Sequence, residues 1–432
     1  MNNILINIKH RVSMKNKAWI KKQWLMLILL TALIMFSSNQ RVFPEENHCI
    51  TCHSLLGGKN DTIIQEFNSD IHHQKGLSCH SCHGGNPNEA DMTKAMSPDA
   101  GFVGVPSHEM IPQFCARCHS DSNTMKKYNP SLPVDQIDKY STSIHGIKLK
   151  SGDTKVAVCT SCHSTHMILP ANDPISSVYV KNIHKTCGKC HANADYMKSY
   201  KIPTQQVSQY LSSVHGKALF KKGDISAPTC NDCHGNHGAI PPGIDNIALI
   251  CGNCHVHNME FFMESPMAKI WTQSQFHACT TCHQTHDIKH PSSEMLGAKK
   301  GVCINCHTPH DKGFEAGQAM KTLLDHVENA LDTANQSMHD AEGKGMDVSE
   351  AHDFFQEAKQ SFYQAKTAVH TFQPDKVKVI IDKGIVSAEG ATKISREAIK
   401  EHKNRRYGLG FATVLLTLLI LGIYLKLRDI EK

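Results

Sequence analysis

The sequence of 432 residues lacks several features that mark common enzyme classes. It contains no glycine-rich phosphate loop, no zinc-finger spacing and no residue pattern typical of a nucleophilic enzyme. Aromatic residues make up only 6% of the chain, and proline and glycine interrupt residues 40–311, so neither long helices nor a large conventional core is expected there. Isolated cysteines are also absent, because all 18 occur in pairs with two residues between them.

Each cysteine pair is followed directly by histidine, which gives nine Cys-x-x-Cys-His motifs. This is the c-type haem attachment signature. Two thiols at this spacing add to the vinyl groups of one porphyrin, and the adjacent imidazole reaches its iron. A disulfide scaffold, the alternative, would not place histidine after every second cysteine. The predicted attachment residues for nine covalent c-type haems are Cys49, Cys52, Cys79, Cys82, Cys115, Cys118, Cys159, Cys162, Cys187, Cys190, Cys230, Cys233, Cys251, Cys254, Cys279, Cys282, Cys303 and Cys306.

Histidine supplies the predicted iron ligands. The predicted proximal ligands are His53, His83, His119, His163, His191, His234, His255, His283 and His307. Enough further histidines lie in the same segment to give every iron a second imidazole. An iron with two protein ligands has no open position, which suits electron transfer better than substrate chemistry.

An internal repeat organises the haem segment. The pattern Tyr-x-x-Ser-x-His-Gly occurs at 140–146 and again at 210–216, with a weaker copy that ends at His72 and a fourth copy that ends at Met267. Each copy precedes two haem motifs, so the segment reads as one leading haem followed by four two-haem repeats. We number these repeats 1 to 4; their motifs begin at Cys79 and Cys115, Cys159 and Cys187, Cys230 and Cys251, and Cys279 and Cys303.

The repeat also predicts distal iron ligands. A second histidine three residues after a proximal one cannot reach the opposite face of the same iron, but it can reach a neighbouring haem. The alternative is that these histidines bond propionates or backbone groups. The histidine candidates are His72, His145, His166, His215, His237, His286 and His310. Sequence alone does not rank or place His48, His73, His80, His108, His184, His257, His277 and His290.

Met267 stands in repeat 4 where His145 and His215 stand in their repeats. If those histidines are distal ligands, the same backbone path presents the Met267 thioether to an iron. The alternatives are that Met267 packs in the core, with His277 or His257 on the iron, or that the iron is left open. Methionine ligation would raise the reduction potential of that haem above its bis-histidine neighbours.

After His310 the composition becomes helical. Apolar residues from Met320 to Ala341 recur every three or four residues, and a similar stripe runs from Ala351 to Val369 after a predicted capping box. Pro374 is expected to open a third helix. We therefore expect an antiparallel bundle or short coiled coil. His326, His339, His352 and His370 are interpreted as surface or packing histidines of this bundle.

The two apolar runs lie near the ends of the chain. The first, from Trp24 to Phe36, is short for a membrane span and follows several lysines, so it predicts a signal peptide; an uncleaved anchor is the alternative, because the cleavage site is poor. The second, from Gly408 to Leu425, is long enough to span a membrane. A buried hydrophobic hairpin is the alternative there. Export of the haem segment would place the haems outside the cytoplasm.

The predicted fold is mainly α: a haem-packed cytochrome with short helices and loops, then a helical bundle and a transmembrane helix. The predicted domains are residues 1–39 (signal peptide or anchor), 40–311 (nonahaem domain), 312–404 (three-helix bundle or stalk), 407–426 (transmembrane helix) and 427–432 (cytoplasmic tail). The formal charge of +6 does not indicate nucleic-acid binding, because haem propionates offset surplus Lys and Arg.

The chain resembles multihaem c-type cytochromes with doubled Cys-x-x-Cys-His motifs, which are loosely related to cytochrome c3-type and nitrite-reductase-associated cytochromes. The resemblance rests on the segments 159–166, 230–237 and 279–286, two of which follow 140–146 and 210–216. It implies bis-histidine haems and electron transfer in anaerobic respiration, with a membrane quinol-oxidising complex or an extracytoplasmic reductase as redox partner. The chain departs from the tetrahaem members that oxidise quinol, which are anchored at the N-terminus.

The alternative function is that of a multihaem oxidoreductase acting on a small nitrogen or sulfur compound such as nitrite, hydroxylamine or tetrathionate. Relatives of that kind often replace the proximal histidine of the active haem. All nine proximal positions here are histidine, which favours the electron carrier, with no catalytic residue assigned.

Overall fold

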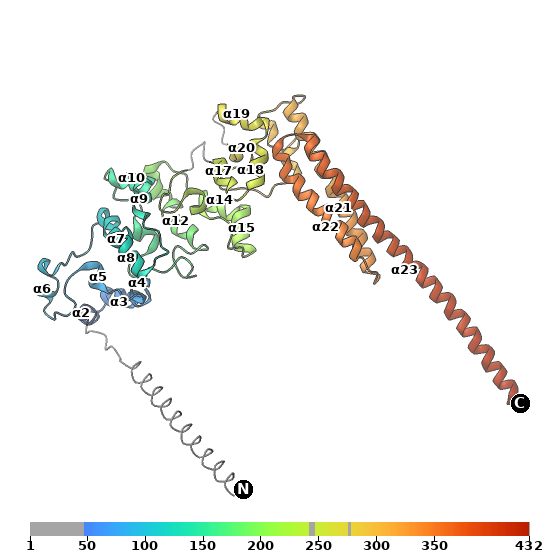
Figure 1. Cartoon of the computed structure of the whole chain (residues 1–432), viewed down its shortest axis with the longest axis horizontal. Helices are drawn as coiled ribbons and strands as arrows, with labels where there is room; N and C mark the ends of the chain where they lie inside the picture. The colour runs from blue at the N-terminus through green and yellow to red at the C-terminus, as the bar shows by residue number, and fades with distance from the viewer. Residues whose placement is uncertain (1–46, 242–246, 275–277, 432) are drawn as a thin grey trace, which may run out of the picture. The chain divides into compact units, whose positions relative to one another are not determined.

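The structure is a computed structural model that describes residues 47–241, 247–274 and 278–431 (Figure 1). Throughout these ranges the regular structure is helical, without a β-strand, which confirms the predicted mainly-α fold. The predicted signal peptide or anchor at residues 1–39 lies outside the described residues, as does His277. The chain divides into two parts, Met1–Phe114 with Ser164–Leu169 and Cys115–His163 with Pro170–Lys432.

The first part consists of short helices joined by loops. Its elements are α2 (His48–Leu56), α3 (Lys59–Ser69), α4 (Ile71–Gln74), α5 (Cys79–His83), α6 (Met92–Ala95), the 3-10 helices η1 (Pro98–Ala100) and η2 (His108–Met110), and the start of α7 (Ile111–His119). The haem motif at Cys79 forms all of α5, a single turn capped by Ser78. Gly84 follows at φ 68°, and a Cβ there would lie 1.9 Å from the Gly101 carbonyl oxygen, so the motif ends at a position that only glycine can occupy.

The haem-motif region of the second part is built in the same way. Its elements are α8 (Ser122–Tyr128), α9 (Gln136–Thr142), α10 (Ile144–Lys150), α11 (Cys159–His163), α12 (Ile183–His191), α13 (Ala194–Met197), η3 (Lys198–Tyr200), α14 (Gln206–Ser212), α15 (Val214–Lys221), α16 (Cys230–His234), α17 (Ile247–Gly252), α18 (Val256–Met263), α19 (Pro266–Ser274), α20 (Ala278–His283), η5 (Ser293–Leu296) and η6 (Cys303–Asn305). Buried apolar side chains are sparse here, whereas the bundle that follows has a continuous apolar core.

Three long helices follow the haem motifs: α21 (Lys312–Glu342), α22 (Ser349–Ala368) and α23 (Pro374–Ile430), with η7 (Val369–Thr371) between the last two. Figure 1 shows them side by side. Every residue of the predicted α21 stripe is buried: Met320, Leu324, Val327, Leu331, Ala334, Met338 and Ala341. Val377, Ile381 and Ala388 of α23 complete the core, and Pro374 opens its helix as expected.

The predicted capping box before α22 is wrong in detail. The helix begins at Ser349, and the N-cap position is Val348, which has no side-chain hydrogen bond to offer. Asp347 lies one residue too early and accepts from the Ser349 backbone N–H at 2.9 Å. The carboxylate still satisfies one of the free amides at the helix start, but from outside the cap position.

The third helix continues without a break into the C-terminal apolar segment. α23 has 57 residues, a length of about 85 Å at the usual rise per residue. Its most apolar window has a mean hydropathy of 2.2 and is not buried inside the protein, so by length and composition this helix is a candidate membrane span. The glycines that could have bent the rod, at 384, 390, 408 and 410, lie within continuous helix.

The bundle packs against the last haem repeat and is not a separate stalk. Phe261 of α18 and Leu296 of η5 lie against the bundle core. The Gln318 side chain donates to the Leu296 carbonyl at 2.9 Å, and Lys321 pairs with Glu294 at 2.9 Å. Exposed ion pairs add little stability, so the apolar contacts carry this interface.

Gly384 lies where the three bundle helices pack closely together. A Cβ there would lie 2.9 Å from the Ser361 Cβ and 3.3 Å from Val327 Cγ2. We expect Gly384→Leu to lower the free energy of unfolding of the bundle by about 1–3 kcal/mol, because overpacking forces the helices apart. Thermal unfolding followed by circular dichroism measures the change. Lys383→Leu adds the same side chain one position earlier on the exposed face and should leave the unfolding temperature within about a degree; equal effects of the two substitutions would contradict this packing.

Candidate haem sites

Each repeat places its candidate distal ligand at a break between two helices. In repeats 2 and 3 the serine ends one helix and caps the next: the Ser143 hydroxyl donates to the Tyr140 carbonyl and accepts from the Gly146 N–H at 3.0 Å, and Ser213 does the same with Tyr210 and Gly216. Both serines are fully buried. The next helix therefore starts in a fixed direction, with the histidine in its first turn.

The tyrosine and glycine of the pattern have separate structural roles. The Tyr140 hydroxyl donates to the Ala157 carbonyl at 2.9 Å, and the Tyr210 hydroxyl to that of Pro228 at 3.0 Å, two residues before the following haem motif in both cases. Burial raises the pKa of both tyrosines to about 12. A Cβ on Gly146 would lie 2.0 Å from the Tyr140 carbonyl oxygen, so the sharp helix–helix junction requires glycine there.

Repeat 1 uses Asp70 in place of serine, a substitution that sequence comparison of the repeats missed. Its buried carboxylate accepts from the His72 backbone N–H at 2.8 Å, from His72 Nδ1 at 2.8 Å and from the Ile168 N–H at 2.6 Å. Burial acts to raise the pKa of Asp70, but these hydrogen bonds hold it below the ordinary value. Aspartate and serine are interchangeable helix caps, which is the signal that could have identified this position.

A backbone hydrogen bond ties each of the first three repeats to the one that follows. The residue after the cap donates to a carbonyl two residues beyond the next trailing histidine: Ile71 to Ile168 at 2.8 Å, Ile144 to Ala239 at 3.0 Å and Val214 to Ile288 at 2.8 Å. In repeat 4 this position is Pro266, which has no N–H to donate. The ties bring the trailing histidines of one repeat to the first haem motif of the repeat before it.

Within the described ranges, the structure brings a second imidazole opposite six of the nine proximal histidines. Imidazole nitrogens bind a transition metal at about 2 Å, so two imidazoles on opposite sides of one iron have ring centres about 6 Å apart. The ring-centre distances are 6.3 Å for His83–His166, 6.2 Å for His145–His191, 6.0 Å for His163–His237, 6.2 Å for His215–His255, 6.0 Å for His234–His286 and 6.0 Å for His283–His370. The spacing fits an iron in each gap.

Five of these pairs follow a simple rule. The proximal histidine of the first motif in a repeat faces the trailing histidine of the next repeat, as in His163–His237. The proximal histidine of the second motif faces the capped histidine of its own repeat, as in His145–His191. The sixth pair breaks the rule, because His370 belongs to η7, at the turn between α22 and α23.

Most of the paired histidines lie in surroundings that favour the neutral imidazole, which is the form that binds metal. Burial lowers the pKa of nine of the twelve: His145, His163, His166, His191, His215, His237, His283, His286 and His370. His83 Nδ1 contacts the Gly104 carbonyl at 2.8 Å, and His370 Nδ1 contacts that of Thr367 at 2.9 Å. Such contacts leave Nε2 to face the gap.

Cysteine sulfurs of consecutive motifs also touch. The Cys187 thiol is hydrogen-bonded to that of Cys230, and Cys251 is bonded in the same way to Cys279. A third bond joins Cys115 and Cys159. If each motif holds a haem, these atoms would be its thioether sulfurs, and neighbouring motifs would hold their haems close together.

The last motif lies against the start of α21. His307 Nδ1 contacts the Asp311 carboxylate at 3.0 Å, and Asp311 caps α21 through the Phe314 N–H. A Cβ on Gly313 would lie 2.2 Å from the His307 ring, and one on Gly317 would lie 3.2 Å from the Cys303 sulfur. These two glycines, one helical turn apart, let the motif approach the helix backbone.

The remaining candidate iron ligands differ in their exposure to solvent. His310 is exposed, with φ 76°, and His257 is exposed and paired with Glu260 at 2.9 Å, which disfavours His257 as an alternative to Met267. Met267 is partly buried beside Phe262, and Ser265 forms the same buried cap as the serines of repeats 2 and 3. His53 is partly buried in α2.

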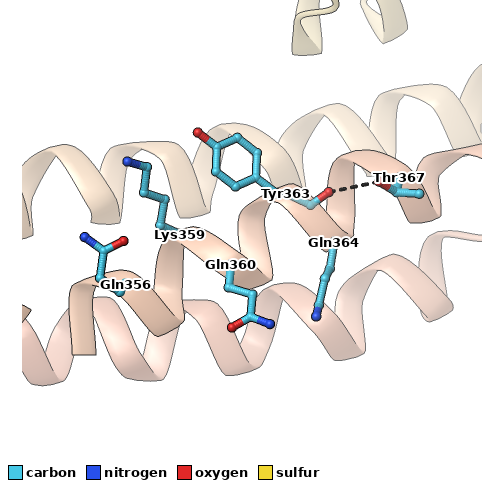
Figure 2. A pocket seen from close by; sticks show the side chains of 6 residues that line it. All are labelled: Gln356, Lys359, Gln360, Tyr363, Gln364 and Thr367. Atoms are coloured by element: carbon cyan, nitrogen blue, oxygen red, sulfur yellow. Dashed lines mark hydrogen bonds between the residues drawn. The ribbon is translucent and has the colours of Figure 1, made fainter. Parts of the chain in front are cut away.

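A pocket lies apart from the predicted haem residues. It lies on one face of α22 and is lined by Gln356, Lys359, Gln360, Tyr363, Gln364 and Thr367 (Figure 2). The labelled side chains all come from this one helix, and the bond drawn between them, from the Thr367 hydroxyl to the Tyr363 carbonyl, belongs to the helix itself. This surface carries none of the predicted attachment or ligand residues.

No family model matches the chain, and no solved structure matches it. It is 25% identical over 118 residues to C-type polyheme cytochrome OmcC of Geobacter sulfurreducens, which covers 27% of this chain and 14% of OmcC. It is 25% identical over 265 residues to OmcB of the same species, covering 60% of this chain and 27% of OmcB. It is 24% identical over 275 residues to multiheme cytochrome MtrA of Shewanella baltica, covering 57% of this chain and 80% of MtrA.

The chain thus spans well under a third of OmcC and OmcB, although most of MtrA is covered. The similarity is low, but it falls on proteins whose names describe the same chemistry as the nine motifs. Haem c is the cofactor, and electron transfer the role, that these relatives suggest. The chain is a distant homologue of the multihaem c-type cytochromes.

Proposed function

We propose that this protein is a nonahaem c-type cytochrome, anchored to a membrane by α23, that carries electrons between a membrane donor and an extracytoplasmic acceptor in anaerobic respiration. The observation that carries the proposal is the pairing of imidazoles about 6 Å apart, a spacing that leaves room for an iron between the two rings. When bound, each haem would supply a one-electron ferric/ferrous couple. The paired histidines would hold the irons and exclude other ligands.

The contacts between cysteine sulfurs support conduction along the chain. Cys115–Cys159, Cys187–Cys230 and Cys251–Cys279 each join the second motif of one repeat to the first motif of the next. Within repeats, burial and then neighbouring thiols, among them Cys190, raise the pKa of Cys162. Burial and then Cys251 likewise raise the pKa of Cys233 to about 11. From the motif at Cys115 to that at Cys279, each motif thus lies next to the one that follows it in the sequence, as a chain of haems requires.

The redox partners belong to the proposal: a quinol-oxidising membrane complex or an extracytoplasmic reductase. A spectrum of the purified ferric protein tests the carrier against an oxidoreductase acting on a small nitrogen or sulfur compound. We expect low-spin signals that do not change when nitrite, hydroxylamine or cyanide is added, because protein ligands occupy the irons. A high-spin signal that shifts with nitrite would instead show an open iron and support the enzyme.

The membrane anchor is tested by truncation. Deletion of residues 408–432 removes the apolar end of α23 and leaves the bundle core intact. We expect the truncated protein to appear in the soluble fraction with nine haems that resist acid–acetone extraction, while the full chain partitions with membranes. Retention of the truncated protein in the membrane would show that residues 24–36 form the anchor.

Met267 is proposed as the distal ligand of the haem at Cys303, because the capped residue of repeats 2 and 3 faces the second motif of its own repeat. The ferric wild-type protein should then show a weak, long-wavelength sulfur-to-iron charge-transfer band, and Met267→His should abolish it and lower one reduction potential. Met263→His, on the exposed side of α18, is the control and should change neither. Absence of the band from the wild type, with no shift in Met267→His, would remove Met267 from the ligand set.

A further inference from the structure

We infer that His370 is the distal iron ligand of the haem at Cys279, so that the helical bundle completes the haem array. The inference rests on the proposed function, because it requires a haem at that motif. His370 lies in η7 and faces His283, the proximal histidine of the motif, with ring centres 6.0 Å apart and ring planes at 27°. Among the six pairs the distances run from 6.0 to 6.3 Å, so this pair has the same geometry as those within the repeats.

The order of the repeats explains why a ligand from outside is needed. In repeats 1, 2 and 3 the first motif receives the trailing histidine of the next repeat. Repeat 4 is followed by α21, so His283 has no such partner available. His310, the last trailing histidine, is exposed and lies outside this pairing. Pro266 is consistent with the absence of a following repeat, because proline cannot donate the backbone hydrogen bond that ties each earlier repeat to its successor.

Packing and hydrogen bonds hold the turn that carries the His370 ring. The Thr371 side chain is fully buried and donates to the Ala368 carbonyl at 2.8 Å. Phe372 adopts a left-handed conformation at φ 52° and packs against the cluster of Phe262, Ala268 and Ala278 in repeat 4. That conformation is unfavourable for a residue with a side chain, so the packing must offset its cost.

The His370 ring itself is set for metal binding. Its Nδ1 lies 2.9 Å from the Thr367 carbonyl, the arrangement in which Nδ1–H donates to the backbone and Nε2 is left as the free nitrogen. Glu260, the acidic side chain on neighbouring α18, is exposed and pairs with His257 at 2.9 Å. The bundle therefore presents a neutral, oriented imidazole to repeat 4.

This assignment changes the role of the bundle. His370 lies four residues before Pro374, the first residue of α23, so the ligand and the candidate membrane helix are joined by a single tight turn. Docking of the bundle and closure of the iron site at Cys279 are then the same event. A stalk without this role would tolerate changes in the turn without any effect on a haem.

Two substitutions in the full-length protein test the assignment. His370→Ala should keep the wild-type number of covalent haems but convert one haem from low spin to high spin in the ferric electron paramagnetic resonance spectrum. Added imidazole should restore the low-spin signal. His370→Met should give a new sulfur-to-iron charge-transfer band and raise one reduction potential, with the rest of the redox titration unchanged. His326→Ala, an exposed histidine on α21, is the matched control and should change none of these signals.

The outcomes separate the two proposals. If the wild-type protein carries no covalent haem, the proposed function fails and the assignment fails with it. If the wild type carries its haems but neither His370 variant changes spin state, band or potential, His370 is not a ligand while the electron carrier stands. General misfolding of the Ala variant would appear as haem loss that imidazole does not reverse. In that case His370→Met, which keeps a ligand at the position, is the decisive variant. If it gives neither the charge-transfer band nor a shift in reduction potential, the assignment is overturned.

Discussion

An iron held between two imidazoles needs two chain segments on opposite sides of the porphyrin, with ring centres about 6 Å apart. The second imidazole cannot come from the residues beside the motif, because they lie on the proximal side. In this protein the first motif of repeat 4 faces His370 of the bundle, and those of repeats 1, 2 and 3 face a histidine of the following repeat, as His83 faces His166. Each of the latter sites is a crosslink between repeats. Backbone hydrogen bonds from Ile71, Ile144 and Val214 join the same pairs of repeats.

This constraint explains why the haem segment folds with so few buried apolar residues. Leu219 and Val158 are among the few side chains there that are almost fully buried, whereas the bundle buries a continuous stripe from Met320 to Ala341. Buried serines take the place of core residues at the helix junctions of repeats 2, 3 and 4. A buried hydroxyl is stable only when its hydrogen bonds are made, and each of these donates and accepts one. The structure is thus specified by caps and ligand positions more than by apolar volume.

Local patterns in the sequence predicted the local structure well. The bundle stripes and the start of α23 follow from helical periodicity and from a first-turn proline, both of which depend on neighbours within a few residues. The tyrosine, serine, histidine and glycine of the repeat were recognised as a pattern, but their separate functions became clear only from distances. The N-cap of α22 was predicted one residue too early, at Asp347 instead of Val348. The residue at which the backbone becomes helical is visible only in the structure.

Contacts between residues far apart in the chain could not be predicted from the sequence. Trailing histidines were expected to reach a neighbouring haem, yet nothing in their spacing says whether that haem precedes or follows. Asp70 was missed because serine occupied the corresponding position in the other copies, although both side chains cap helices equally well. His370 gave no signal at all, since it lies 87 residues after His283 in a segment without haem motifs. A one-residue contact of that kind leaves no periodicity to detect.

Arrays of repeats need atypical ends, because the last repeat lacks the neighbour that completes all the others. Here the end of the array is adapted at three positions of repeat 4. Pro266 removes the donor that would have no acceptor, Met267 replaces the capped histidine, and Ala268 stands where repeats 2 and 3 have glycine. Phe372, which follows His370 by two residues, packs against the apolar cluster of repeat 4. The bundle thus brings one imidazole to His283, where each earlier repeat receives the trailing histidine of its successor.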